Sequence, residues 1–597
     1  MLSDFALRSA CLPEDTTSEE IMLTLALTER RRANQVLTTR TCTVMCVWAV
    51  LGAAHCPAQA RIGVRDATGQ RGMVVSTSPE GSDVGLAILK RGGNAVDAAV
   101  ATAFAMAVTH PAAGNIGGGG FMLIYPADGR PPGMIDYREK APIAATRNMF
   151  INRTSHDGHK VVGVPGTVRG LWLAHQTYGS LEWAALVEPA VALARDGFHL
   201  SGGLARSLNG AVGRITDFPE FRRTYGKDGG KPTWKPGDRF IQRDLAKTLD
   251  RIRVLGYKGF YSGETASLLI DEMKRGGGLI TQADLDGYQA VIREPIHATF
   301  RGYDVYGPPP PSSGGICLTE MLNILEHFDL KSMERWSPET NHLIIETMRR
   351  AYCDRAKFLG DTDFVSIPPY LTSKAYAKKL ASGIDRTRAT PSESLAAPIQ
   401  LADEGTETTH FSVIDRNGMA VSNTYTLERG FGSKVVVRGA GFLLNNEMGD
   451  FNWKPGVTDR HGRIGTPANE IRPAKRMLSS MTPVIASRHG KVVLVTGSPG
   501  GRTIINTVLC VTLNVLEFGM DLRPALDAPR LDQEWFPDRV TFGSSEEDVA
   551  YPDLVPKLRL LGHDVRIGHQ GDANSILVKH GVIHGAADNR WGKASGF

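Results

Sequence analysis

Long apolar runs are absent from this sequence of 597 residues. A membrane-spanning helix needs about 18 or more consecutive apolar residues. No run reaches that length, so we expect a soluble protein. The hydrophobic share of 42% is that of an ordinary globular chain. The length allows several domains, or one large α/β body made of two closely packed halves.

Metal-binding motifs are also missing. The sequence has no CxxC pair, no HExxH motif and no Asp-rich cation loop, so we expect no catalytic metal. Of the seven cysteines, four fall before residue 60, and Cys317, Cys353 and Cys510 are widely spaced with apolar neighbours. This spacing offers no disulfide framework and predicts three buried thiols.

A strong charge of one sign is missing as well. The 68 Lys and Arg residues nearly balance the 63 Asp and Glu residues, which leaves a net charge of +5 with no long basic run. That balance argues against nucleic acid as the main partner of this protein.

The first 60 residues have the pattern of a secretion signal. A cluster of arginines between residues 30 and 40 precedes the apolar stretch 42–54, and a small-x-small cleavage site ends at Ala60. We predict a leader over 1–60, cleavage after Ala60, and a periplasmic or secreted protein. Membrane retention by an uncut leader stays an alternative, and the first 35 or so residues also fit a start codon set too early.

The segment from Thr408 to Thr426 carries the first chemical hypothesis. Residues 409–415 alternate like a strand, a turn follows at 416–418, and residues 419–426 predict the second strand of a hairpin. If the bond before Thr408 is cut, this residue gains a free α-amine beside its own hydroxyl. An α-amine with a pKa of about 8 can act as general base for that hydroxyl. Taken alone, a Thr-Thr pair at a strand start is simply a good strand former.

The rest of the chain reads as blocks of helices and strands. A helix buried on most sides is expected at 94–109, and the following Gly-rich stretch 114–120 precedes a strand. A phosphate cradle needs the reverse order, strand then helix, so a tight loop is expected instead. Helices are also predicted at 81–89, 181–195, 243–256, 263–275, 315–328, 342–358 and 503–518. Strands are predicted at 441–444, 484–486, 492–496, 575–578 and 582–585. Residues 385–407 are predicted to form a flexible linker.

Three motifs follow the hairpin. Residues 445–451 place two carboxylates in a turn, 476–483 offer adjacent hydroxyls, and 496–502 set glycines before a helix. Glycines at a helix N-terminus expose backbone N–H groups that suit an oxyanion. Each motif alone has an ordinary structural explanation, because acidic turns, Ser-Ser pairs and Pro-Gly-Gly loops are common.

Together these motifs resemble the γ-glutamyltranspeptidases (glutathione hydrolases) of the N-terminal-nucleophile hydrolase superfamily. The resemblance covers about residues 61–597. Its landmarks stand in order along the chain: GGNAVDAAVA (92–101), GNIGGGGFM (114–122), DYRE (136–139), VPGTVRG (164–170), TTHFSV (408–413), LLNNEMGDF (443–451), LSSMTP (478–483), TGSPGG (496–501) and DAPR (527–530).

The resemblance implies a nucleophile and its helpers. Thr408 would be freed by self-cleavage after Glu407, and its hydroxyl would attack the substrate's γ-carbonyl to form a γ-glutamyl ester. Thr426 matches the second threonine that orients the nucleophile. Gly500 and Gly501 would donate backbone N–H groups to the oxyanion.

The resemblance also implies how the glutamyl head group is held. Arg138 would pair with the α-carboxylate, a task for which a guanidinium fork is suited. Ser479 and Ser480 match residues that hold the same carboxylate. Glu447 and Asp450 would bind the α-ammonium, which places a cationic group at one end of the site and anionic groups at the other.

Two positions depart from the family's commoner pattern. Glu428 stands where many members carry Asn, so it could add a third carboxylate for the ammonium or turn away to pair with Arg429. Residues 455–469 correspond to the family's lid, in which members usually place a bulky residue, and His461 is the nearest match here.

The resemblance implies the four-layer αββα fold of mixed α/β class, formed by two subunits from one self-cleaved chain. The large subunit would span 61–407 and the small, catalytic subunit 408–597, associated as a heterodimer. The reaction expected is γ-glutamyl transfer from glutathione and related amides to water, or to amino acids and dipeptides, without a cofactor.

Two competing interpretations remain open. A related acylase could use the same nucleophile on another amide, such as a β-lactam side chain; Arg138 with the Ser479–Ser480 pair argues against it. A catalytically inactive binding homologue is the other alternative, and the presence of Thr408 and Thr426 argues against that.

Overall fold

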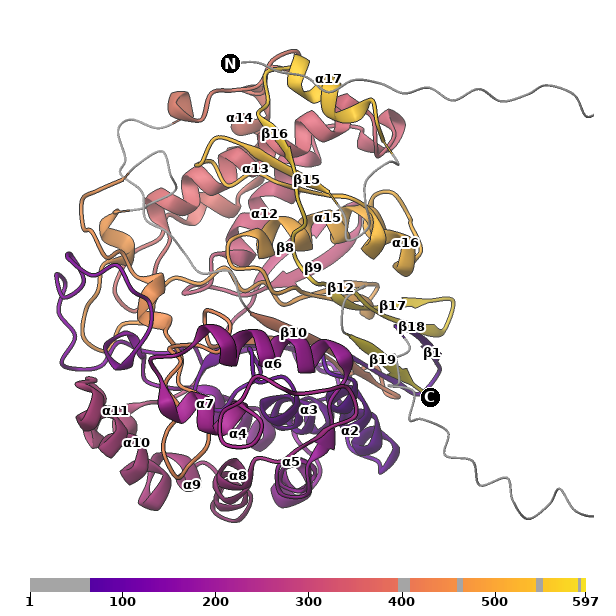
Figure 1. Ribbon diagram of the computed structural model, residues 1–597. Coiled ribbons are helices and arrows are strands. Elements are labelled where there is room, and N and C mark those ends of the chain that lie inside the picture. The colour runs from indigo at the N-terminus through magenta and orange to yellow at the C-terminus, as the bar shows by residue number, and fades with distance from the viewer. Residues whose placement is uncertain (1–64, 396–407, 459–464, 544–550, 589–591) are drawn as a thin grey trace, which may run out of the picture. The chain divides into compact units, whose positions relative to one another are not determined.

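The computed structural model describes residues 65–395, 408–458, 465–543, 551–588 and 592–597. The chain divides into two compact units, Met1–Gln59 and Ala60–Phe597, and every described residue belongs to the second. The expected leader, residue Glu407 and His461 lie outside the described residues. Within the second unit, two sheets stack between two layers of helices (Figure 1).

The predicted hairpin forms the centre of the first sheet. Strand β10 (Thr409–Asp415) has the predicted bounds and pairs antiparallel with β11 (Ala420–Thr426). Val413 packs among the helices on one side while Ile414 faces the second sheet, as the two-residue period of a strand requires. The sheet runs in the order β19 (Lys593–Gly596), β2 (Gly72–Ser76), β10, β11, β3 (Gly119–Tyr125), β4 (Gly133–Asp136) and β7 (Val291–Arg293).

The second sheet is also antiparallel and has seven strands. Apolar residues of both sheets and of the helices behind the second sheet form one core cluster. The order of the second sheet is β1 (Asp66–Gly69), β18 (Val582–Ala587), β17 (Asn574–Lys579), β13 (Lys491–Thr496), β12 (Val484–Arg488), β9 (Tyr303–Gly307) and β8 (Ile296–Phe300). Smaller sheets join β14 (Arg530–Asp532), β15 (Val540–Gly543) and β16 (Val565–Ile567), and β5 (Phe198–His199) with β6 (Arg239–Phe240).

Helix α3 (Ala95–Thr109) is the centre of the layer that covers the first sheet. Asn94 caps it through a capping box with Asp97, and all its residues are buried, as its run of small apolar side chains predicts. Other helices before residue 290 are α2 (Pro79–Lys90), α4 (Thr167–Tyr178), α5 (Trp183–Asp196), α6 (Gly202–Arg214), α7 (Pro219–Tyr225), α8 (Arg243–Leu255), α9 (Lys258–Tyr261), α10 (Gly263–Gly276) and α11 (Gln282–Gly287).

The second helix layer packs on the outer face of the second sheet. Figure 1 shows α12, α13 and α15 together there. The helices after residue 300 are α12 (Gly314–Leu325), α13 (Pro338–Phe358), α14 (Lys374–Ser382), α15 (Thr503–Leu516), α16 (Leu522–Asp527) and α17 (Leu554–Leu560). Within the described residues, none of the helices combines the length and the apolar character that crossing a membrane demands. Cys317, Cys353 and Cys510 are buried thiols that form no disulfide with one another, as predicted.

Two sequence predictions were wrong. Residues 441–444 are not a strand: Val436 and Leu443 form one isolated bridge, and Gly441, at φ +74°, makes a turn. The first part of the predicted flexible linker is fixed in place. The carbonyl oxygen of Asp385 contacts His342 Nε2 at 2.8 Å, and Trp535 Nε1 donates to the carbonyl of Ser392 at 2.8 Å. Buried partners therefore order residues 385–395, while 396–407 lie outside the described part.

Candidate active site

Thr408 lies at one end of the first sheet, directly before β10, and its exposed fraction is 8%. Strand β11 ends at Thr426 beside it, and β3 begins there at Gly119. The Gly-rich loop before β3 lets two backbones approach closely: a Cβ at Gly118 would lie 2.0 Å from the carbonyl oxygen of Thr426. The tight-loop prediction is thus confirmed, and the loop supports the end of β11.

One cavity of about 260 Å³ collects nearly all the predicted site residues. Among the predicted site residues that the structure describes, Gly500 is the exception, although it adjoins the lining residue Gly501. Met481 and Ile504, for which the sequence predicted no role in the site, supply apolar walls. The residues that line the cavity are Arg138, Thr408, Thr426, Glu428, Glu447, Asp450, Ser479, Ser480, Met481, Gly501 and Ile504.

Gly500 and Gly501 form the turn between β13 and α15. Their φ angles are +135° and +59°, in the region that favours glycine. A Cβ at Gly500 would lie 2.5 Å from Thr503 Oγ1. Among the described residues, neither backbone N–H donates a hydrogen bond. Two backbone donors at a helix N-terminus, one of them on a residue that lines the cavity, are therefore unused within the described part of the chain.

Arg138 is the buried cation of the site, with no exposed surface. Its guanidinium lies 2.5 Å from a Glu447 carboxylate oxygen, donates to Asp450, and lies 3.7 Å from Glu139. It also donates to the carbonyl oxygen of Leu478 at 3.1 Å. Burial lowers the pKa of Arg138, but the three carboxylates raise it by more, so the side chain stays charged.

These contacts correct one expectation. The sequence analysis placed a cationic group and anionic groups at opposite ends of the site, yet Arg138 contacts Glu447 and Asp450 directly. Buried charges are costly unless they are paired, and here the two predicted halves of the head-group site pair with each other. A substrate head group must therefore exchange with these ion pairs in order to bind Arg138.

The carboxylates crowd one another. Burial raises the pKa of Glu447 well above its ordinary value, although Arg138 opposes this effect. Burial, followed by the Asp450 charge, raises the pKa of Glu428 to about 8. Burial also raises the pKa of Glu139 to about 8. Burial in one small region therefore disfavours the charged form of all three carboxyl groups.

Glu428 pairs with Arg429 and also lines the cavity. Its carboxylate accepts from the amide of Asn446 and pairs with Arg429 Nε at 3.3 Å, and it also lines the cavity. Its backbone has φ +79°, and its N–H donates to Thr426 Oγ1 at 2.7 Å. The ion pair with Arg429 is therefore confirmed, while a substrate contact stays a prediction.

Hydrogen bonds from Arg355, a residue that the sequence did not point to, fix the Ser479–Ser480 loop in place. Arg355, on α13 and 1% exposed, donates to Ser480 Oγ at 2.8 Å and to Ser313 Oγ at 2.9 Å. Ser313 Oγ in turn donates to the carbonyl oxygen of Ser479 at 2.7 Å. Nothing in the local sequence links α13 with this loop, because the contact spans 125 positions.

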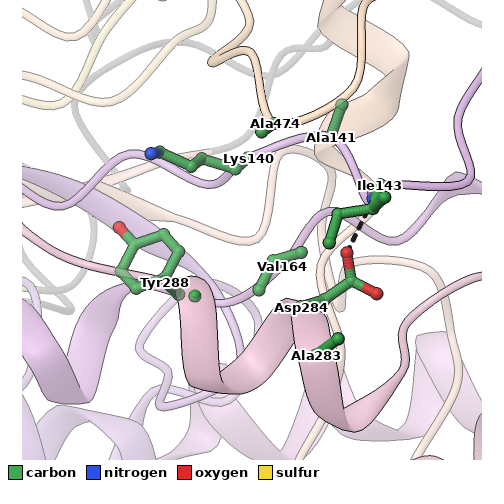
Figure 2. Close-up of a pocket in the computed structure, with 9 residues that line it drawn as sticks. Lys140, Ala141, Ile143, Val164, Ala283, Asp284, Tyr288 and Ala474 are labelled. Atoms are coloured by element: carbon green, nitrogen blue, oxygen red, sulfur yellow. Dashed lines mark hydrogen bonds between the residues drawn. The ribbon is translucent and has the colours of Figure 1, made fainter.

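A separate, mostly apolar pocket of about 320 Å³ has Lys140, Asp284 and Tyr288 among its lining residues (Figure 2). Asp284 accepts from the backbone N–H of Ile143 at 2.6 Å across its rim. Tyr288, at the other end, donates through its hydroxyl to the carbonyl oxygen of Arg138 at 2.8 Å. The two pockets share none of their lining residues, so they are separate sites.

The spacing of His342, Glu346 and His563 fits a metal site within the described residues. Their ligand atoms already have protein partners: His342 Nδ1 and His563 Nε2 are 2.8 Å apart, and Glu346 accepts from Arg350 at 2.7 Å. None of the three lines the Thr408 cavity. We therefore interpret this cluster as a buried hydrogen-bond network and not as a metal site.

Comparison with known proteins agrees with this geometry. The sequence profile described as Gamma-glutamyltranspeptidase matches residues 81–597. A glutathione hydrolase proenzyme of Escherichia coli (strain K12) is 45% identical over 534 residues, which cover 87% of this chain and 90% of that protein. This chain belongs to the gamma-glutamyltranspeptidase family.

Solved structures of the family share its four-layer αββα fold. A cephalosporin acylase from Bacillus halodurans, 26% identical, superposes with a TM-score of 0.78 over 89% of this chain and 97% of that one. The gamma-glutamyltranspeptidase of Helicobacter pylori, 41% identical, gives a TM-score of 0.53 over 56% of this chain and 95% of that one. The predicted N-terminal-nucleophile hydrolase fold is confirmed.

Proposed function

We propose that this enzyme transfers γ-glutamyl groups from glutathione and related amides to water, or to amino acids and dipeptides, through an ester on Thr408. One observation carries the proposal: a hydroxyl, a buried guanidinium with carboxylates, and a glycine turn with available N–H donors border one cavity. A free amino-acid head requires both signs of charge, and an acyl transfer requires a nucleophile and an oxyanion site.

Activation by self-cleavage at Glu407–Thr408 is part of the proposal. It would give a large subunit, 61–407, and a small subunit, 408–597, held as a heterodimer. Strands β10 and β11 would come from the small subunit and their neighbours β2 and β3 from the large one, within a single sheet. The relative from E. coli is named a proenzyme, which supports maturation of this kind. Export through the 1–60 leader is proposed with it.

The chemistry proceeds in two halves. The α-amine of Thr408, with a pKa of about 8, takes the proton of its own hydroxyl as the oxygen attacks the γ-carbonyl carbon. The oxyanion accepts from the N–H groups of Gly500 and Gly501. The C–N bond breaks, the leaving amine takes the proton, and a γ-glutamyl ester remains on Thr408. Water or an acceptor amine then attacks the ester and restores the hydroxyl.

The glutamyl head group is proposed to exchange with the internal ion pairs. The α-carboxylate binds Arg138, Ser479 and Ser480, and the α-ammonium binds Glu447 and Asp450. Each protein charge then keeps an opposite partner, so no buried charge is left unpaired during binding.

Two further residues complete this assignment. Glu428 is proposed as an additional contact for the ammonium, because it lines the cavity despite its pairing with Arg429. Thr426 orients the nucleophile from the end of β11, and its hydroxyl oxygen is fixed by the N–H of Glu428 at 2.7 Å.

A related acylase activity is the second candidate function. The observation that supports it is the superposition on a cephalosporin acylase. Arg138 with the Ser479–Ser480 loop suits an α-carboxylate, and this favours a γ-glutamyl substrate. Glutathione hydrolysis, assayed beside hydrolysis of an acyl-β-lactam, separates the two. Turnover of the β-lactam without turnover of glutathione would favour the acylase.

The deciding experiment is the intact mass of the purified protein together with N-terminal sequencing of each fragment. Two associated chains, one of them beginning Thr408-Thr409-His410, are expected, along with release of glutamate from glutathione. A single uncut chain without activity would instead favour the inactive binding homologue.

A further inference from the structure

Two buried arginines contact the loop that precedes β12. Arg138 donates to the carbonyl oxygen of Leu478 at 3.1 Å. Arg355, near the end of α13, donates through its guanidinium to Ser480 Oγ at 2.8 Å. Arg138 and Ser480 line the Thr408 cavity, whereas Arg355 does not. Arg355 can therefore act on a bound substrate only through a residue that does line the cavity.

Arg355 also holds Ser479, through one intermediate hydroxyl. Its Nε donates to Ser313 Oγ at 2.9 Å, and Ser313 Oγ donates to the carbonyl oxygen of Ser479 at 2.7 Å. The backbone N–H of Ser313 donates to the same carbonyl oxygen at 2.8 Å. Ser313 directly precedes α12 and is fully buried. One guanidinium thus fixes both serines of the loop, Ser480 directly and Ser479 through Ser313.

The contact with Arg355 sets the direction of the Ser480 hydroxyl. A hydroxyl donates one hydrogen bond and also accepts, and it rotates to suit its neighbours. A guanidinium is always charged and only donates, so the oxygen of Ser480 accepts and its proton points away from Arg355. Acceptance from a cation also polarises the hydroxyl, which strengthens the hydrogen bond that it donates. A carboxylate in the cavity is the acceptor that such a donor favours.

We propose that Arg355 is a positioning residue that makes the site select an ionised α-carboxylate over a neutral α-carboxamide. It acts through Ser480, whose oriented proton is donated to one oxygen of the carboxylate while Arg138 binds the same group. A carboxamide carries no negative charge, so the polarised hydroxyl stabilises it less. The inference rests on the proposed function and names a specificity determinant for it.

Tyr352 offers a comparison on the same helix. It lies one turn before Arg355 and is equally buried, and its hydroxyl donates to the carbonyl oxygen of Arg502. Arg502 directly follows the glycine turn, so this hydrogen bond leads to the proposed oxyanion site and not to Ser480. Loss of either contact removes a buried hydrogen bond of α13, but the loss at Tyr352 leaves the Ser480 hydroxyl oriented.

The first test is a double-mutant cycle on glutathione hydrolysis by the processed enzyme. Arg355→Met removes the donors at a similar side-chain length, and Ser480→Ala removes the hydroxyl. Each should raise KM by about tenfold, the effect of a hydrogen bond to a charged group. Because Arg355 is proposed to act through Ser480, the double variant should have nearly the KM of Ser480→Ala alone. Effects that multiply in the double variant would overturn the inference.

The second test measures the selection directly. γ-Glutamyl-p-nitroanilide and its α-carboxamide counterpart differ only in the group that Ser480 is proposed to contact. Arg355→Met should lower kcat/KM for the carboxylate by about tenfold and leave that for the carboxamide nearly unchanged. The matched control Tyr352→Phe should affect both substrates equally and so keep their ratio. A ratio in Arg355→Met equal to that of the wild type would overturn the inference.

A milder variant guards against misfolding of the first. If Arg355→Met does not mature, the same ratio is measured in Arg355→Lys, where it should still fall because one ammonium replaces the guanidinium fork. An unchanged ratio there would overturn the inference. Where turnover of the carboxamide is too slow to follow, its inhibition constant against the carboxylate substrate replaces kcat/KM.

The two proposals fail in different ways. A wild type that does not hydrolyse glutathione would overturn the proposed function together with this extension. A wild type that hydrolyses glutathione, with a ratio that the Arg355 variants leave unchanged, would overturn the extension alone.

Discussion

Arg138 and Glu447, separated by more than 300 positions in the sequence, meet at 2.5 Å with both side chains fully buried. Pairing of this kind stabilises each charge only while the other is present. The head-group site is therefore a single charged cluster, and any change to one member alters the others. The following predictions use this coupling and the geometry around Thr408.

Replacing Thr408 by Ala should leave a single uncut chain, because the same hydroxyl serves self-cleavage and substrate attack. Intact mass measurement is the readout, and glutathione hydrolysis should be lost. Thr409→Ser, which keeps a hydroxyl at the first residue of β10, is the matched control and should mature normally. Cleavage before residue 408 in the alanine variant would refute the mechanism.

Replacing Arg138 by Lys should raise KM for glutathione by about 10- to 100-fold, because one ammonium cannot reproduce two charge-assisted hydrogen bonds. Maturation should still occur, since Thr408 and the glycine turn are intact. Steady-state kinetics on the processed enzyme measure the effect. Arg416→Lys, in the exposed turn of the hairpin, is the control. An unchanged KM would remove Arg138 from the site.

Replacing Gly500 by Ala should lower kcat by about 100-fold or more with a smaller effect on KM. The new Cβ would meet Thr503 Oγ1 at 2.5 Å and shift the N–H groups that are proposed to bind the oxyanion. Gly490→Ala is a matched control, because Gly490 also has positive φ, +72°, but lies in the β12–β13 turn with open space around it. Equal losses in both variants would mean that backbone strain alone, without the oxyanion contact, explains the effect.

Glu428→Gln should make the protein more stable at pH 8 than the wild type, and less so at lower pH. In the folded protein Glu428 has a pKa of about 8, whereas the pKa of a Glu side chain in the unfolded chain is about 4.3. Between these values the folded state holds a proton that the unfolded state lacks, so the free energy of unfolding falls as pH rises.

Thermal unfolding at about pH 6 and about pH 8 tests this linkage. The Tm difference between Glu428→Gln and the wild type should grow over the interval, and the control Glu294→Gln, at an exposed position, should show no such trend. A difference that is independent of pH would mean that Glu428 stays ionised in the folded state.

The sequence predicted the parts of the fold that depend on local pattern. The alternation of residues 409–415 and the turn after them gave the correct bounds for β10, and the capped, small apolar run gave α3. The motif order located nine of the residues that line the Thr408 cavity.

The failures concern contacts between distant segments. Residues 385–395 have a linker's composition, but His342 and Trp535 fix them from elsewhere in the chain. Arg355 lies in a helix whose sequence has no distinguishing motif, yet its guanidinium donates a hydrogen bond to Ser480 Oγ. The direct pairing of Arg138 with Glu447 and Asp450 also escaped prediction, because no sequence pattern shows which buried charges neutralise each other.

The first sheet interleaves strands from both sides of the proposed cut: β10 lies between β2 and β11, and β11 lies between β10 and β3. Synthesised as two separate polypeptides, each half would present unpaired strand edges, which promote aggregation. A continuous chain brings these strands together at the modest entropic cost of closing a loop. Cleavage would then change how the backbone is connected without changing which strands are neighbours. The uncut chain would thus be the template on which the proposed pair of subunits is assembled.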